Sequence, residues 1–73
     1  IEAIARGDRR SSRVVGRRIE EIALPKGATI NVIVRGNDVL EAHHDTVVQT
    51  EDHLILFVTD RRQIQQVKRL FRT

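Results

Sequence analysis

Cysteine is absent from the 73-residue chain, which excludes disulfide bonds and metal sites built on thiolates. Its absence is compatible with a reducing compartment. Tryptophan and tyrosine are absent too, so two phenylalanines are the only aromatic side chains on which nucleic-acid bases could stack. No apolar run approaches the roughly 20 residues that a membrane-spanning helix needs.

Glycine is scarce and scattered, which argues against nucleotide chemistry within this chain. The four glycines lie about ten residues apart, so no glycine-rich loop could cradle a phosphate. No serine, histidine and aspartate are spaced so that local structure would assemble a catalytic triad. We therefore expect a protein that is not an enzyme.

The size of the chain limits its stability. A domain this small buries only about 60% of the surface that its unfolded chain exposes, so its core is marginal. Without disulfides or metals, self-association is the expected source of further stability. The chain begins with Ile1 in an apolar stretch rather than with methionine, so we expect a fragment of a longer protein.

Charge is segregated along the chain. Residues 1–18 carry six arginines and two acids, residues 19–60 carry two basic residues and eight acids, and residues 61–73 carry five basic residues and no acid. Basic ends could bind nucleic acid or an anionic membrane, or could simply form solvated faces that pair with acidic surfaces. A nucleic-acid-binding domain would draw on five arginines of the first segment: Arg9, Arg10, Arg13, Arg17 and Arg18.

Most of the expected strands lie in the middle of the chain. Residues 29–35 alternate, with Ile30, Val32 and Val34 on one face, and Ile33 is the apolar exception. A Gly-Asn link joins this run to residues 38–43 and predicts a hairpin. Residues 1–6 and 46–49 are weaker candidates. The unbroken apolar run 54–58 predicts a central strand covered on both faces.

Two helices are expected. Residues 16–23 place Ile19, Ile22 and Ala23 at helical spacing, and a Leu-Pro-x-Gly turn at 24–27 ends that helix. Asp60, followed three residues later by Gln63, resembles a capping box. It opens a closing helix with an apolar stripe: Ile64, Val67, Leu70 and Phe71. The expected fold class is α+β, a small mixed β-sheet with two packed helices in the order β-α-β-β-β-α.

His43, His44 and Asp45 are the only cluster with metal-ligand chemistry. Adjacent residues of a strand point to opposite faces, so the two histidines cannot both reach one ion unless the strand ends between them. A loop or interface role is therefore expected in place of a metal site.

Five motifs, taken in order, resemble the C-terminal lobe of the domain that regulates conductance of potassium, called the TrkA-C or RCK_C domain. The resemblance covers residues 14–71, and it is closest to the chain-terminal lobe of the Trk-type uptake regulators. The chain departs from the family pattern at Glu51, where glycine commonly precedes the aspartate. The motifs are Val-Gly at 15–16, Leu-Pro-x-Gly at 24–27, Ile-x-x-Ile-x-Arg at 30–35, Asp-Thr at 45–46 and Glu-Asp at 51–52.

The resemblance implies that residues 1–73 form one regulatory lobe of a cytoplasmic gating subunit, which acts at the inner face of the cell membrane on a potassium transporter or channel. NAD or ATP would bind to the nucleotide-binding Rossmann lobes of the parent chain, and no cofactor is expected in this segment. Some relatives bind cyclic di-AMP or a cation between paired lobes. A dimerisation scaffold without any ligand remains an alternative.

We expect a symmetric homodimer, because the chain is small, its apolar residues exceed what one sheet would cover, and the family pairs these lobes. Ile33 and Phe71 are the candidates for the interface. Arg35, His43 and His44 are the candidates for a ligand pocket at that interface. For Arg35 the alternative is an ion pair with Glu41 across the hairpin.

Overall fold

The computed structural model describes residues 1–72. Four strands, one α-helix and two short 3-10 helices make up its regular structure. Long irregular segments connect β1 to β2 and β3 to β4. In chain order the elements are β1 (Glu2–Ile4), η1 (Ile19–Glu21), β2 (Ala28–Arg35), β3 (Asp38–Glu41), β4 (His53–Val58), η2 (Arg61–Gln63) and α1 (Ile64–Leu70).

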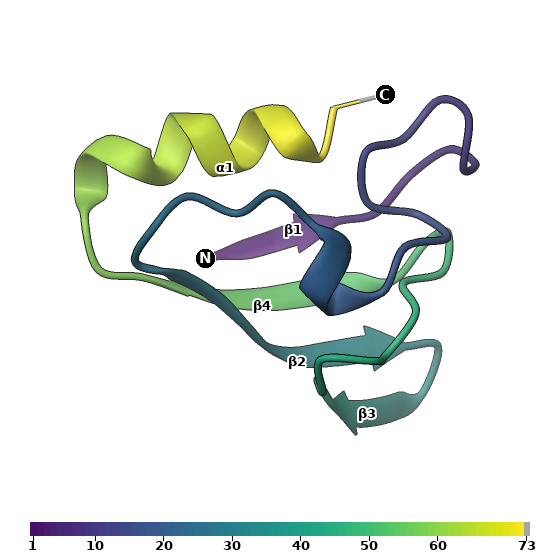
Figure 1. Ribbon diagram of the computed structural model, residues 1–73. Coiled ribbons are helices and arrows are strands. Elements are labelled where there is room, and N and C mark those ends of the chain that lie inside the picture. Colours follow the sequence, from purple (N-terminus) through teal and green to yellow (C-terminus); the bar gives the residue numbers. More distant parts are fainter. Residues whose placement is uncertain (73) are drawn as a thin grey trace.

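The strands form one sheet in the order β1-β4-β2-β3, and every neighbouring pair is antiparallel (Figure 1). The α+β class is confirmed, but the expectation of a mixed sheet is wrong. The β2–β3 hairpin turns at Gly36 and Asn37 as the sequence predicts. The chain returns to the centre of the sheet with β4, which lies between β1 and β2.

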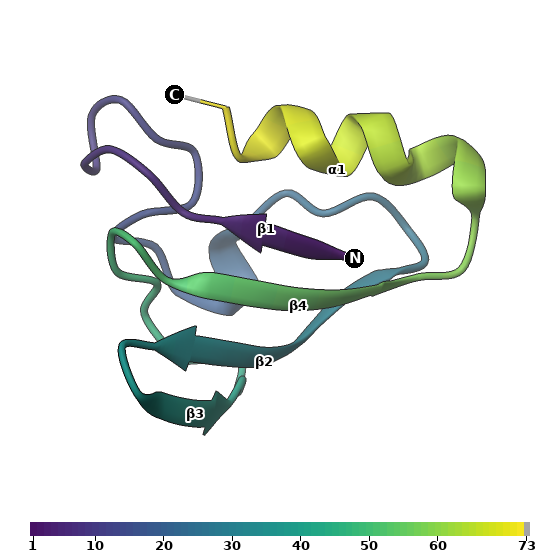
Figure 2. The same cartoon turned by 180° about the vertical axis from the view of Figure 1, so that it is seen from behind.

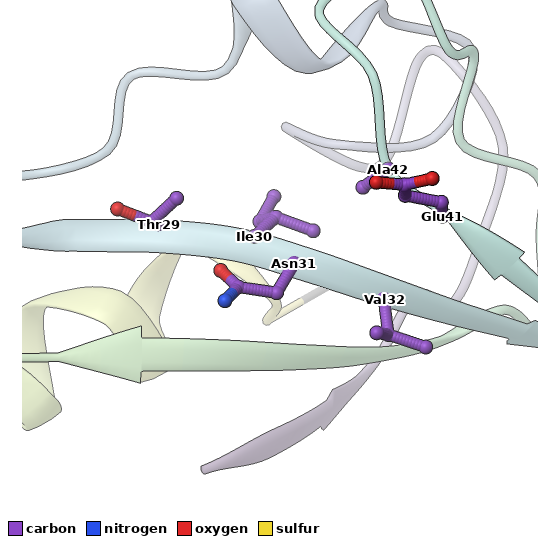
Figure 3. Close-up of a pocket in the computed structure, with 6 residues that line it drawn as sticks. All are labelled: Thr29, Ile30, Asn31, Val32, Glu41 and Ala42. Carbon is purple, nitrogen blue, oxygen red and sulfur yellow. The ribbon is translucent and has the colours of Figure 1, made fainter.

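A β-bulge in β2 reverses the expected alternation. Ile30 pairs with Leu56 and Val32 pairs with Ile55, so Asn31 is an extra residue on β2 (Figure 3). A bulge shifts the side-chain phase by one position. Ile30 and Ile33 therefore share the core face, and Ile33 is 0% exposed. The expectation that the sheet leaves Ile33 uncovered for a partner is thereby corrected.

One face of the sheet carries the core. Ile33, Leu54 and Leu56 are fully or almost fully buried there. Helix α1 lies along the β1 side of the sheet and contributes Val67 to the same cluster (Figures 1 and 2). Phe71, at the end of α1, is also buried in the core, so it offers little exposed surface to a second copy. The apolar stripe of the closing helix thus stabilises the domain itself.

The helix expected over residues 16–23 does not form, and only the single turn η1 is present. The backbone amides of Ile19 and Glu20 donate to the carbonyls of Thr46 and His44, on the segment between β3 and β4. These bonds to a distant segment replace the intrahelical pattern, and nucleating a two-turn helix is costly in any case. The predicted strand 46–49 is likewise reduced to one bridge between Arg18 and Val47.

The start of the closing helix follows the sequence. The Asp60 carboxylate accepts a hydrogen bond from the backbone amide of Arg62, as an N-cap residue should. The Gln63 side chain does not complete the box, because its Oε1 is buried without a hydrogen-bond partner.

The Leu-Pro-x-Gly turn before β2 needs its glycine. Gly27 has φ +92°, and a Cβ there would lie 2.5 Å from Thr59 Oγ1.

The central position of β4 is confirmed, but its coverage on both faces is not. Leu54 and Leu56 are buried, whereas Phe57 on the opposite face is 71% exposed. No element of residues 1–72 packs over that side chain. An apolar run of this kind was expected to mark a strand covered on both faces, and in the single chain it marks a strand covered on one.

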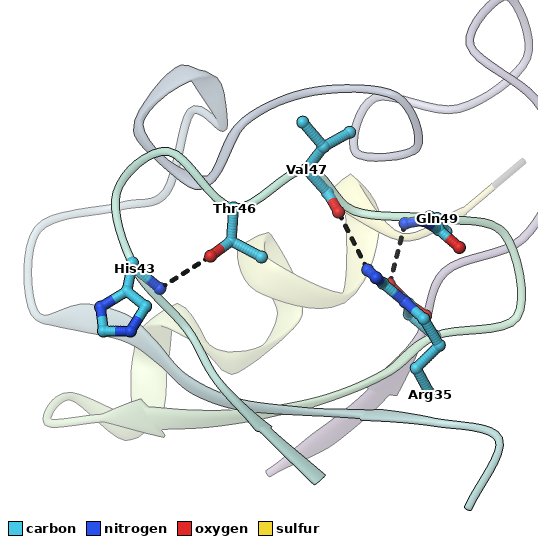
Figure 4. A network of polar contacts seen from close by, with 6 residues as sticks. Arg35, His43, Thr46, Val47 and Gln49 are labelled. Atoms are coloured by element: carbon cyan, nitrogen blue, oxygen red, sulfur yellow. Dashed lines mark hydrogen bonds and ion pairs between the residues drawn. The ribbon is translucent and has the colours of Figure 1, made fainter. Parts of the chain in front are cut away.

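A buried aspartate joins three parts of the fold, and Figure 4 labels its partners Arg35 and Gln49. Asp52 is 1% exposed and accepts two hydrogen bonds from Arg35, at 2.9 Å from Nε and 2.9 Å from Nη2. Its Oδ2 also accepts from the backbone amide of Gln49 at 2.8 Å. The same Nη2 of Arg35 donates to the carbonyl of Val47 at 3.0 Å. We call these residues the Arg35–Asp52 clamp.

Leu56→Ala should lower the free energy of unfolding by about 2 to 5 kcal/mol, because it opens a cavity in the core. Phe57→Ala should change it by about 0.5 kcal/mol or less, since the ring is exposed. Denaturant melts at a concentration that prevents association measure both. Similar losses for the two variants would contradict the one-sided burial of β4.

Arg35→Gln should cost about 2 to 4 kcal/mol, because it leaves the buried Asp52 carboxylate without its charged partner. The matched control is Arg62→Gln, which removes the exposed ion pair with Asp60 and should cost much less, because water screens both charges. Denaturant melts of both variants provide the comparison. Equal effects would show that the clamp stabilises no more than a surface pair.

Candidate functional site

An open cleft lies beside the bulge at the junction of β2 and β3 (Figure 3). Its volume is about 560 Å³. The bulge helps to form the cleft. The backbone carbonyl of the extra residue Asn31 accepts a hydrogen bond, at 3.0 Å, from the backbone amide of Ala42, just beyond the end of β3. The cleft is lined by Thr29, Ile30, Asn31, Val32, Glu41 and Ala42.

The lining combines apolar surface with a few polar groups. Val32 and Ala42 supply apolar contact, and the exposed Asn31 offers an amide that can both donate and accept. Thr29 adds a hydroxyl and Glu41 a carboxylate. Such a surface suits a ligand with flat apolar parts and polar edges, since apolar walls with a small number of polar groups are typical of small-molecule sites.

The two predicted histidines follow this cleft directly in sequence, and both side chains are exposed. His43 Nε2 lies 4.0 Å from Glu41 Oε2, and the backbone amide of His43 donates to Thr46 Oγ1 at 3.0 Å (Figure 4). The carbonyl of His44 accepts from the amide of Glu20. His43 therefore lies at the rim of the cleft, while the backbone of His44 holds the 19–21 turn in place.

Arg35 lies away from the cleft, in the clamp. Hydrogen bonds with Asp52 raise the pKa of Arg35, so its positive charge is firmly committed to this pair. The alternative partner, Glu41, is not used, and the guanidinium is only partly exposed. The structure thus separates Arg35 from the two histidines with which the sequence analysis grouped it. Its present contacts assign it to positioning the segment that carries Val47 and Gln49.

Sequence reasoning missed the outer face of the sheet. The pairing register places six apolar residues on the side opposite the core, and Figure 2 shows the strands from this side in front of the long connections. Phe57 and Val39 are 71% and 72% exposed. The alternation within 53–58 could have revealed it. The six residues of this outer apolar face are Ile4, Val32, Val34, Val39, Ile55 and Phe57.

The outer apolar face and the cleft are continuous. Val32 belongs to both, and Thr29 of the cleft pairs with Phe57 across β2 and β4. Within residues 1–72 no three histidine, aspartate or glutamate side chains are placed to hold one metal ion. The outer apolar face and the cleft therefore form one continuous surface of exposed apolar and polar groups.

Several curated proteins are similar to this chain. It is 61% identical to the Trk system potassium uptake protein TrkA of Halomonas elongata and 48% identical to that of Vibrio alginolyticus, over 71 residues in each case. A TrkA homolog of Archaeoglobus fulgidus is 38% identical over 63 residues. The first two matches cover 97% of this chain but only 16% of each relative, so the chain spans about a sixth of their length.

Solved structures of RCK_C and RCK domains have a similar fold. The RCK_C domain dimer of S. agalactiae BusR in complex with c-di-AMP has a TM-score of 0.74 and 27% identity, over 97% of this chain and 92% of that one. A longer BusR chain in complex with its busAB-promotor DNA gives the same TM-score and identity, and the match covers 34% of it. An RCK domain described "with cda" shares the fold at TM-score 0.69 and 18% identity.

The sequence profile of the TrkA-C domain matches residues 9–72, nearly the whole chain. Together with the identity to the curated relatives and the fold shared with the BusR lobe, this match defines the family. The chain belongs to the TrkA-C domain family.

Proposed function

We propose that this chain is a regulatory lobe of a potassium uptake protein, that it works as a symmetric dimer, and that it senses a small ligand between the two copies. The observation that carries the proposal is the continuity between the outer apolar face and the cleft. Exposed apolar patches of this kind mark association sites. The names of the curated relatives support a role in potassium uptake.

The dimer is proposed to form through the outer apolar face, with the exposed Phe57 and Val39 near its two ends. These two side chains lie on β4 and β3, and the intervening strand contributes Val32 and Val34. A two-fold interface uses the same patch on both copies, so a self-complementary apolar face suits it. The similar BusR lobe is described as a dimer, which supports the pairing.

Pairing would bring the two clefts to one interface, because each cleft adjoins the outer apolar face at Val32. A ligand with two equivalent halves could then contact both copies. Cyclic di-AMP has two such halves, and it is the ligand named for the BusR dimer. We propose that Asn31 and His43 provide hydrogen bonds, with Val32 and Ala42 against the bases.

A ligand that contacts both copies favours one angle between them. Its binding can therefore regulate the complete protein by changing the relative orientation of the two lobes. In the complete protein the angle would be passed to nucleotide-binding Rossmann lobes, where NAD or ATP would bind, and from there to a membrane potassium transporter or channel. No helix within the described residues could span a bilayer. We place the lobe in the cytoplasm, beside the inner face of the membrane.

The nucleic-acid alternative is less well supported. Of the five arginines it would use, Arg18 forms ion pairs with Glu20 and Glu21, and Arg9 donates to the carbonyl of Gly16. These guanidinium groups are partly occupied by contacts within the chain. The DNA complex of BusR involves a chain of which this lobe matches about a third, so it does not assign DNA contacts to the lobe.

Phe57→Glu should convert the dimer to a monomer, because it replaces the largest exposed apolar side chain of the proposed interface with a charge. The control is Gln65→Glu, which adds the same charge at an exposed position of α1. Sedimentation equilibrium over a wide concentration range gives the mass. Ile33→Glu is unsuitable here, since it would disrupt the core. A wild-type monomer at tens of micromolar would refute the interface.

Asn31→Ala should weaken cyclic di-AMP binding by about tenfold, the effect of losing one hydrogen bond of about 1.4 kcal/mol. Asn37→Ala in the hairpin turn is the control, because that side chain is also exposed but lies outside the cleft. Calorimetry measures both affinities. If the monomeric Phe57→Glu variant bound the ligand as tightly as the wild type, the site would not be shared between two copies.

A further inference from the structure

The two basic ends of the chain meet in space. The loop over residues 7–13 lies beside the C-terminal end of α1 in both ribbon views (Figures 1 and 2). An open depression of about 450 Å³ lies between them, lined by Ser11, Arg13, Arg69 and Arg72. Arg13 is thus brought to two arginines that follow it by more than 55 residues. The β2–β3 cleft lies at the other side of the sheet.

In the part of the chain that the structure describes, no carboxylate pairs with these three guanidinium groups. Within residues 1–72 none of the three forms an ion pair or a side-chain hydrogen bond. In contrast, four other arginines are engaged, with carboxylates or a carbonyl: Arg9, Arg18, Arg35 and Arg62. The local excess of positive charge is therefore real and is concentrated at one place.

The loop that carries Arg13 is held in shape by its own side chains. Asp8 Oδ1 accepts from the backbone amides of Arg10 and Ser11, and the buried Ser12 hydroxyl accepts from those of Val14 and Val15. The bonds from the Ser11 and Arg10 amides lower the pKa of Asp8, which keeps that carboxylate ionised. Arg13 thus projects from an ordered turn, as a binding site requires.

A role in helix stability explains only part of the cluster. Lys68 and Arg69 lie in the last turn of α1, where positive charge complements the helix dipole. Arg13 belongs to another segment and gains nothing from that dipole. Three like charges beside one depression repel one another, and an anion placed among them would relieve this repulsion. Guanidinium forks match phosphate oxygens with two parallel hydrogen bonds.

We propose that Arg13, Arg69 and Arg72 form a second site, which binds a phosphate group. The Ser11 hydroxyl is directed to Asp8 and shapes the wall of this site. The phosphate could be that of a small phosphorylated molecule or that of an anionic lipid headgroup. The chemistry of recognition is the same for both sources. This site does not depend on the dimer or on the cleft.

The test compares two double variants of the full-length protein that carries these residues. Arg13→Gln with Arg72→Gln removes two charges from the site and leaves Arg69 to complement the helix. Lys26→Gln with Arg61→Gln removes two exposed charges near the opposite end of α1, where the 24–27 turn contacts the segment that precedes η2. Thermal melts of both variants check that they fold. The net charge of the two variants is equal, so general electrostatics affects them alike.

Pyrophosphate is the soluble probe, titrated by calorimetry, and vesicles of phosphatidylglycerol, compared with phosphatidylcholine, are the lipid probe. At least one probe should bind the wild type saturably, with a loss of tenfold or more in the site variant and less than twofold in the control. Binding of pyrophosphate alone identifies a soluble ligand, and binding of anionic vesicles alone identifies a headgroup. Equal losses of affinity in the site variant and the control variant would overturn the proposal, as would the absence of binding to both probes.

Discussion

The burial of one carboxylate organises the irregular half of this domain. Asp52 is removed from water, and a buried carboxylate is tolerated only when charged and hydrogen-bonding partners surround it. Arg35 and the amide of Gln49 meet this need. The backbone carbonyl of Asp52 also accepts from Ala5, just after β1. One residue therefore ties the ends of β1 and β2 to the segment that leads into β4.

The segment 44–48, which precedes Asp52, holds a second irregular stretch of the chain in place. Its carbonyls at His44, Thr46 and Val48 accept from the amides of residues 16–20, so two irregular stretches hold each other by backbone hydrogen bonds. Glu51 adopts φ +69°, a left-handed conformation that costs a side-chain-bearing residue about 1–2 kcal/mol. The family pattern commonly has glycine there, which fits this geometry. The clamp offsets a strained turn in a domain that has little stability to spare.

The two faces of the sheet differ in burial, because one is covered by the chain itself and the other is exposed. The core face is closed by α1 and the irregular segments, and it uses Ile33 and Phe71, which were expected at an interface. The outer apolar face keeps Phe57 and Val39 exposed beside the cleft. In the proposed dimer the second copy covers this face. The basic ends meet away from β3, so the two proposed ligand sites lie on separate surfaces.

The sequence by itself determined the local elements and the family. Alternation and the Gly-Asn link predicted the β2–β3 hairpin, the apolar run predicted β4, and Asp60 predicted the start of the closing helix. Ordered motifs pointed to the TrkA-C domain. These signals depend on neighbouring residues, so they can be read without knowledge of the distant contacts.

Only the tertiary structure decided what depends on segments far apart in the chain. Residues 16–23 lost their predicted helix because the carbonyls of His44 and Thr46 bind their amides. The bulge at Asn31 directs the Ile33 side chain to the core. The alternation of apolar residues cannot reveal this bulge, because an extra residue is defined only by pairing with the neighbouring strand. Arg35 pairs with Asp52, which lies 17 residues away in the sequence, and not with Glu41 across the hairpin. Burial favours the partner that most needs a counter-charge, and burial is a property of the whole fold.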